Sequence, residues 1–456
     1  MPNLPRKLDP AAGLAYVVDH PRTVIIFILL ITLFFASLLP DLRFHTSIYH
    51  LAVEDLDETR QYHAFKQEFG SEELILVVAK ADDIFDPPVF RQIDRMAREL
   101  SQIKGIKRIV SLPGIKKAME ITDQWTLADF KKTITHVSLF QRNLISEDGK
   151  TTTITLILDD IEEKEPIIDA VSSIIDQNRA SLSLYQIGMP LVARAMAEFT
   201  KQDFVRLPPA IFLLICLILF LLFRNLRGVL IPAGAVLIAL IWTFGIMAWS
   251  GTPISMLTVI VPIFIIAVGT AYCMYIFPEY QSAVRETDSP REASFKCFSR
   301  LALPTALAVV TTTIGLGSLV INKMSAIREF ALFSCLGILF MLIIIFTLLP
   351  AVMALLPVPA RNGERSTGRD LFDPILAAIA RFNLKHQKIS LSLIAVTALL
   401  GMIGISRIPV ETNPIGFFKE ESSIYRNFHD VYRDMAGSFP INVVLNSREE
   451  DFFIWL

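Results

Sequence analysis

The chain alternates between long, uninterrupted apolar runs and stretches of mixed polarity. The apolar runs occupy residues 23–39, 207–223, 228–249, 254–277, 302–321, 330–356 and 389–406. A helix rises about 1.5 Å per residue, so runs of about 20 residues cross the roughly 30 Å of hydrocarbon in a bilayer. The pattern therefore predicts seven membrane helices, five of them gathered between residues 207 and 356.

The first apolar run predicts a retained helix and not a removable signal. Its length, residues 23–39, exceeds that of a signal-peptide core, and the sequence that follows, "LLPDLRFHTS", has no small-residue cleavage motif. Composition agrees with a membrane protein: 19% of the residues are charged and 53% are hydrophobic, whereas ordinary soluble domains are about one quarter charged.

Basic residues gather on alternate connections between the predicted helices. The connection "SGTPIS" carries no Lys or Arg, and "INKMSAIREF" carries one of each. The other connections and the N-terminal flank are richer in Arg and Lys: Arg6, Lys7, Arg22, Arg224, Arg227, Arg285, Arg291, Lys296, Arg300, Arg361, Arg365, Arg369, Arg381, Lys385 and Lys388. Cytoplasmic loops carry the excess of positive charge. The polar region between the first two helices is therefore expected on the side of the membrane opposite to the cytoplasm.

This polar region shows strand patterns alternating with helix patterns. Strands are predicted at 73–80, 107–112, 151–160 and 182–188. Helices are predicted at 86–103 and 165–179, within an insertion at about 114–145, and at 188–204 leading back to the membrane. Two strand–helix–strand units in one domain predict an α+β domain of the ferredoxin-like, split βαβ type.

The chain also begins to repeat itself. His386 follows His20 by 366 positions (386 − 20 = 366), and each stands at the start of an apolar run preceded by an amphipathic segment that opens with "DP". Further along, Thr412 matches Thr46, and "AGSFPINVVL" at 436–445 matches "FGSEELILVV" at 69–78, with Gly437 and Gly70 aligned. A fixed offset over several elements indicates a tandem repeat, so we expect the chain to represent the first half of a longer protein.

This plan resembles the resistance–nodulation–division (RND) superfamily, and within it the MMPL-like exporters of hopanoids and other lipids. The resemblance rests on "RNLRGVLIPAGAVLIALIWTFGIMAWSGTPISMLTVIVP", "GMPLVARAMAEFTKQD", "TTTIGLGSL" and "IREFALFSCLGILFMLIIIFTLLPAVMALL". It implies a membrane α-helical bundle with a periplasmic porter-type α+β domain. The five-helix block resembles a sterol-sensing domain.

The fourth predicted helix departs from the pattern of these relatives. Many MMPL-like members carry Gly-x-x-x-Asp-Tyr there, and the Asp takes part in proton relay. This chain reads Gly269, Thr270, Ala271 and Tyr272, so the Tyr is kept and Ala271 stands where the Asp would be. The cluster is either a coupling or substrate-contact site or a place where small residues let helices pack closely. Loss of the acid favours close packing.

A second polar patch lies on the fifth predicted helix, at Thr311, Thr312, Thr313 and Ser318. These residues either line a polar path beside the fourth helix or bond to carbonyls of their own helix. The Tyr272 hydroxyl is expected to find a partner among the three threonines.

Other chemistry is disfavoured. No Walker A motif occurs, the net charge of −2 offers no argument for nucleic acid, and neither a catalytic triad nor metal-ligand spacing has support. No cofactor, metal site or enzymatic activity is therefore expected, although His45, His50 and His63 lie near one another in sequence. The four cysteines are expected to be small buried hydrophobes: Cys216, Cys273, Cys297 and Cys335.

These observations predict a transporter of the bacterial inner membrane that exports hydrophobic or amphiphilic molecules, lipid-, hopanoid- or sterol-like, towards the periplasm. The alternative is a non-pumping lipid-binding or sterol-sensing relative, or an accessory of protein translocation. The expected partners are membrane lipids and either a second copy or a periplasmic adaptor.

The helix at 373–388 is expected either on the inner membrane surface or against the base of the bundle. The predicted order is an N-terminal amphipathic segment 1–22, a span 23–39, the outer domain 40–206, the five-helix block 207–356, a cytoplasmic linker 357–388, a span 389–406 and the start of a second outer domain 407–456.

Overall fold

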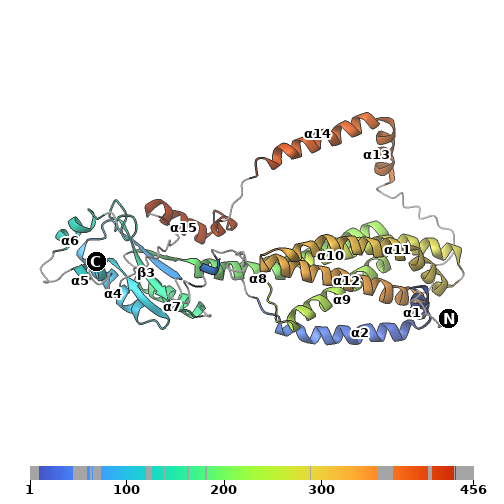
Figure 1. The fold of residues 1–456 in the computed structure, drawn as a ribbon, viewed down its shortest axis with the longest axis horizontal. Coiled ribbons are helices and arrows are strands. Elements are labelled where there is room, and N and C mark those ends of the chain that lie inside the picture. Colours follow the sequence, from blue (N-terminus) through green and yellow to red (C-terminus); the bar gives the residue numbers. More distant parts are fainter. Residues whose placement is uncertain are drawn as a thin grey trace.

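The computed structural model describes residues 10–44, 59–61, 64, 73–119, 126–137, 140–161, 164–179, 182–287, 289–356, 373–408, 413–435 and 437. Figure 1 shows an α/β unit at one end of the molecule and a bundle of long helices at the other, joined by one helix. Several residues of the sequence predictions lie outside the described part of the chain: His45, Thr46, His50, His63, Gly70 and Thr412.

The seven predicted membrane helices are all present among the described residues. They are α2 (Pro21–Leu38), α8 (Met189–Phe223), α9 (Leu226–Trp249), α10 (Ile260–Glu286), α11 (Pro290–Gly317), α12 (Ser325–Leu355) and α14 (Gln387–Ile405). Helix α10 begins at Ile260 and not at 254, because the hydroxyl and backbone groups of Ser255 and Thr258 bond to one another in a turn. Helix α11 begins earlier than predicted, where Ser289 accepts a hydrogen bond from the Glu292 amide as its N-cap.

Helices α9, α10 and α12 form the centre of the bundle, and α2, α8 and α11 surround them. Glycine allows the closest approaches. A side chain at Gly337 on α12 would overlap Ile265 on α10, and a Cβ at Gly245 on α9 would lie 2.6 Å from Phe35 on α2. Glycine has no side chain, so at these two positions the backbone of one helix lies directly against a side chain of the next. The two glycines therefore allow α12 to lie close to α10, and α9 close to α2.

Two helix pairs repeat along the chain. Helix α1 (Pro10–Asp19) leads into α2, and α13 (Asp373–Lys385) leads into α14. His20 and His386 cap the second helix of each pair with nearly the same backbone angles, φ −119° and ψ 54° against φ −123° and ψ 45°. In Figure 1, α13 and α14 stand apart from the five-helix bundle, whereas α1 contacts the ends of α11 and α12.

The α/β unit contains a four-stranded antiparallel sheet with the strand order β2-β3-β1-β4. Its elements in chain order are β1 (Leu74–Lys80), α4 (Pro87–Ser101), β2 (Ile106–Val110), α5 (Leu112–Met119), α6 (Leu127–Ile134), β3 (Thr151–Leu158), α7 (Glu165–Asn178) and β4 (Ser183–Ile187). Strand β2 stops at Val110, short of the predicted 112, because α5 starts at Leu112 and the Ser111 hydroxyl accepts from the Gly114 amide.

The two faces of the sheet have different covers. Ile75, Val77 and Ala79 of β1 pack with α4 and α7 in one apolar core. Val78 and its neighbours on the opposite face belong to a second core, supplied by the start of α8, by η4 (Pro414–Phe417) and by α15 (Ser423–Asp434). The segment that follows α14 therefore covers one face of the sheet in the α/β unit.

Candidate functional site

One contact joins the polar residues predicted on the fourth membrane helix to those predicted on the fifth. The Tyr272 hydroxyl of α10 lies 3.3 Å from Oγ1 of Thr312 on α11. Thr312 donates its own proton to the Ala308 carbonyl at 2.8 Å, so the tyrosine is the donor of the pair. The expected contact between Tyr272 and the threonine run is confirmed.

Gly269 and Thr270 point towards the bundle core. A Cβ at Gly269 would lie 3.1 Å from Val236 of α9 and 3.2 Å from the Met341 sulfur of α12. Thr270 is buried, and its hydroxyl donates to the Ile266 carbonyl of its own helix at 2.6 Å. The geometry of both positions agrees with close helix packing, since Gly269 leaves no room for a side chain and Thr270 is buried with its proton donated to its own helix.

The remaining predicted residues lie elsewhere. Ala271 is exposed on the outer surface of α10, and Thr311 is exposed on α11 with its hydroxyl bonded to the Leu307 carbonyl. Ser318 begins the short helix η3 (Ser318–Ile321) and bonds back to Gly315. Thr313 differs from these, because its buried hydroxyl has no hydrogen-bond partner in the described structure.

The membrane part of the five-helix block holds no charged side chain or histidine. Residues 207–223, 229–278, 301–321 and 330–355 contain no Asp, Glu, Lys, Arg or His. Charged residues return at the end of the bundle remote from the α/β unit, where Arg300 bonds to Glu279 at 3.0 Å and to Glu286 at 2.8 Å. Within the membrane part, the Tyr272–Thr312 contact between α10 and α11 therefore involves hydroxyl groups alone.

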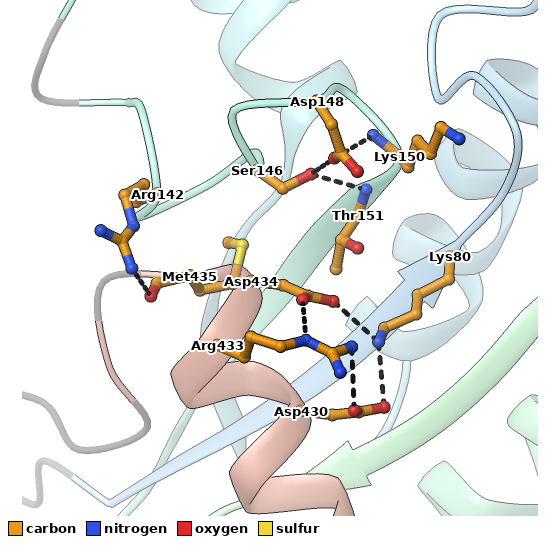
Figure 2. Close-up of polar contacts among 10 residues, drawn as sticks. All are labelled: Lys80, Arg142, Ser146, Asp148, Lys150, Thr151, Asp430, Arg433, Asp434 and Met435. Carbon is orange, nitrogen blue, oxygen red and sulfur yellow. Dashed lines mark hydrogen bonds and ion pairs between the residues drawn. The ribbon is translucent and has the colours of Figure 1, made fainter.

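A second cluster lies in the α/β unit, where α15 crosses the end of β1 (Figure 2). The Lys80 amine donates to Asp434 at 2.8 Å and to Asp430 at 3.0 Å. Arg433 donates to Asp434 through Nε at 2.9 Å and to Asp430 at 3.2 Å. The Lys80 and Asp434 side chains are only 22% and 21% exposed, so solvent screens this pair less than it screens a surface pair.

The protonation equilibria follow this geometry. Burial alone would lower the pKa of Lys80, but its hydrogen bonds to Asp434 and Asp430 outweigh burial and raise it above the ordinary lysine value. Burial would likewise raise the pKa of Asp434, but Lys80 and Arg433 outweigh it and lower that pKa. Burial raises the pKa of the nearby Tyr185 to about 12. Both members of the Lys80–Asp434 pair are therefore charged at neutral pH.

One further contact binds the end of α15 to the unit, and a polar turn lies nearby (Figure 2). Arg142, in a left-handed conformation with φ 61°, donates to the Met435 carbonyl at 3.0 Å. Asp148 organises the turn before β3 by accepting from the Ser146 hydroxyl at 2.6 Å and from the Lys150 amide at 3.0 Å. An open, polar groove of about 950 Å³ lies between this turn, the loop after β1 and the end of α15.

Sequence reasoning missed the Lys80 cluster because its members lie 350 positions apart. One signal was present. Within β1, Lys80 falls on the same alternating face as Leu76 and Val78, where an apolar residue would be expected in a covered sheet. A lysine at such a position requires an acidic partner, because burying an unpaired charge is costly.

Comparison with known proteins places these features in a family. The MMPL family model matches residues 52–381. A protein of Methanocaldococcus jannaschii, named as a membrane protein, is 24% identical over 361 residues, which cover 74% of this chain and 91% of that protein. A second protein named as a membrane protein, from Streptomyces coelicolor, is 24% identical over 254 residues, which cover 52% of this chain but only 29% of its own length. The chain belongs to the MMPL family of the RND superfamily, which implies a multi-pass membrane transporter of lipid-like molecules.

Proposed function

We propose that this chain acts in RND-type export in a bacterial inner membrane, carrying hydrophobic or amphiphilic molecules towards the periplasm. The basic connections lie at the end of the bundle remote from the α/β unit, which supports a periplasmic position for that unit. The strand order and the two strand–helix–strand connections support a ferredoxin-like, porter-type domain. The sterol-sensing character of the five-helix block remains part of this proposal.

The observation that carries the proposal is the continuity of α8. This helix starts at Met189, directly after β4, and continues to Phe223 at the far end of the bundle. Its first turns pack on the sheet through Val192 and Met196, and its later turns contact α9 and α10. One continuous helix therefore connects the sheet to the membrane helices, and it offers a path by which their movement reaches the sheet.

Two adjacent prolines give α8 a defined point of bending. Pro208 and Pro209 lie inside the helix and remove two backbone N–H donors, which weakens the helix there. Just before them, Phe204 packs between Phe44 and Phe244, with ring centroids 5.4 Å and 5.3 Å away. The aromatic contacts of Phe204 therefore fix α8 immediately before the turn that the two prolines weaken. A hinge at the membrane boundary is suited to a transporter in which one group of helices rocks against another.

Coupling to protons requires a side chain that gains and loses a proton during transport. The contact between Tyr272 and Thr312 links the two helices that carry the predicted polar path, but residues 229–278 and 301–321, which include the membrane parts of these helices, contain no Asp, Glu, Lys, Arg or His. This favours a second candidate, a lipid-binding protein of the same family that does not pump. A second copy or a periplasmic adaptor as partner remains a prediction.

Reconstitution separates the two candidates. The purified chain is placed in liposomes of phosphatidylethanolamine and phosphatidylglycerol with a trace of fluorescent lipid, and transfer between leaflets is followed with and without an imposed proton or sodium gradient. The exporter requires transfer faster than in protein-free liposomes. Enriched bound lipid in native mass spectra without transfer supports the non-pumping candidate, and the absence of both contradicts the two proposals.

A further inference from the structure

A small cavity lies where α2 and α9 end on the side of the bundle that faces the α/β unit. Its volume is about 430 Å³, and it is lined by Pro40, Asp41, Leu42, Arg43, Ala248, Gly251 and Thr252. These residues come from η1 (Leu39–Asp41), which continues α2, and the two residues after it, and from the end of α9 and the turn that follows. The volume falls within the range of about 300–1,000 Å³ typical of small-ligand sites.

The cavity has a rigid frame. The Ile254 amide donates to the Arg43 carbonyl at 2.8 Å, and Phe44 and Ile254 form a parallel bridge. Gly251 turns the chain with φ 69°, a conformation that glycine adopts without strain. The two walls therefore remain in register although they lie about 200 positions apart in the sequence.

The position of the cavity corresponds to the water–lipid boundary. The apolar parts of α2 and α9 both end beside it, and Trp249 in the last turn of α9 is 75% exposed. Tryptophan gathers at this boundary because its ring is apolar while its N–H needs a polar partner. Below the cavity, Leu33 and Phe34 present an exposed apolar surface along α2.

Two opposite charges line the cavity without neutralising each other. Among the residues that the structure describes, neither the Asp41 nor the Arg43 side chain has a hydrogen bond or an ion pair, and both are exposed. A guanidinium binds phosphate in a two-point geometry, and a carboxylate binds an ammonium group. The pair is therefore complementary to a ligand that carries both groups.

Thr252 adds an acceptor beside this pair. Ser250 donates its hydroxyl proton to the Met247 carbonyl at 2.9 Å, so in the 3.0 Å contact between Ser250 and Thr252 the threonine is the donor. The lone pairs of the Thr252 oxygen remain free to accept from an N–H group. This places an acceptor for a cation on the wall opposite Asp41.

We propose that this cavity binds the head group of a zwitterionic phospholipid of the outer leaflet, with its phosphate on Arg43, its ammonium group between Asp41 and Thr252, and its acyl chains along the apolar face of α2. The inference rests on the proposed function, since it names a lipid that an exporter of this family meets at the membrane surface. Its chemistry also suits a soluble phosphate ester of ethanolamine, so the experiment compares the two sources.

Native mass spectrometry of the detergent-purified chain measures binding of phosphatidylethanolamine, of phosphatidylglycerol and of soluble phosphoethanolamine. We expect phosphatidylethanolamine to bind best. Arg43→Gln should weaken both lipids by about tenfold or more, because it removes the charged donor to phosphate. Asp41→Asn should abolish the preference for phosphatidylethanolamine over phosphatidylglycerol, and Thr252→Val should reduce it.

Arg407→Gln is the matched control, because Arg407 also follows a membrane helix, α14, but does not line the cavity. Unchanged binding in Arg43→Gln, or an equal loss in Arg407→Gln, overturns the site but leaves the proposed function standing. Equal binding of soluble phosphoethanolamine overturns the lipid assignment. Failure of the unaltered chain to retain any phospholipid overturns the site and also weakens the proposed function.

Discussion

Replacing Lys80 by Met should loosen α15 from the sheet of the α/β unit without unfolding the sheet. The Lys80 amine bonds to carboxylates of α15 at 2.8 Å and 3.0 Å, and methionine keeps the unbranched, apolar part of the side chain while removing the charge. The perturbation therefore separates the ion pairs from the apolar contacts that surround them.

The size of the effect follows from exposure and from the remaining partners. A hydrogen bond to a charged group contributes about 1.5–3 kcal/mol, whereas exposed ion pairs contribute about 0.2–1 kcal/mol. Asp434 is 21% exposed and keeps its bond to Arg433, and Asp430 is 39% exposed. The lower end of the range applies, about 1.5 kcal/mol, which corresponds to about a tenfold increase in the open population of α15.

Hydrogen exchange measured by mass spectrometry reports this population directly. We expect about tenfold faster exchange in α15 and unchanged exchange in β1 and β3, since local openings need not involve the whole domain. Lys131→Met is the control, because it removes a Lys–Asp pair of the same α/β unit, to Asp83 at 2.8 Å, that does not contact α15. Unchanged exchange in α15, or the same increase in the control, would refute the reasoning.

The same contact predicts a dependence on pH. The lowered pKa of Asp434 stabilises docking above the ordinary aspartate value, and that contribution is lost as pH falls through the lowered pKa. The raised pKa of Lys80 stabilises docking fully below the ordinary lysine value, with loss only as pH rises through the raised pKa. Exchange in α15, corrected for the intrinsic rate, should therefore be constant from about pH 5 to 9 and increase below about pH 4. In Lys80→Met the acid-induced increase should be smaller.

Three further substitutions test the membrane part. Gly337→Ala should destabilise the bundle by about 1–3 kcal/mol, because the added methyl overlaps a buried isoleucine, whereas Gly315→Ala meets open space and should leave thermal unfolding in detergent nearly unchanged. Replacing both Pro208 and Pro209 by Ala restores two backbone donors to α8, so transfer in liposomes should slow while lipid binding persists; unchanged transfer would argue against bending there. Tyr272→Phe should slow transfer by roughly fivefold, equivalent to about 1 kcal/mol, through loss of one hydrogen bond, and an unchanged rate would assign this residue to packing alone.

Features with a short sequence period were predictable. The seven membrane helices and the four strands of the outer unit follow from runs of apolar residues and from alternation, which are local properties. The ends of helices were less accurate where a polar side chain decides them. Ser289 starts α11 well before its apolar part, and Met189 starts α8 because the lead-in helix fuses with the span.

Contacts between distant segments were mostly unpredictable. The proximity of Tyr272 to the threonine run could be proposed because their helices are adjacent in sequence, but the inward or outward orientation of each residue depends on the rotation of the helix. Ala271 is exposed and Gly269 is buried only two positions away. Lys80 and α15 are separated by the whole five-helix block, and no local pattern specifies that docking.

The sheet of the α/β unit is linked to the membrane helices in two ways. Helix α8 continues directly from β4 into the five-helix bundle, whereas α15, which follows α14 in the chain, is held on the sheet by non-covalent contacts. Phe428 and Val431 of α15, with Ile415 and Phe418 before it, are at most 7% exposed, and each such side chain contributes about 1.5–3 kcal/mol on burial. Together they outweigh the ion pairs of Lys80. The apolar cluster therefore keeps α15 docked, and the charges adjust its open population. In the proposed rocking mechanism, displacement of α14 would act on the same sheet to which α8 is joined.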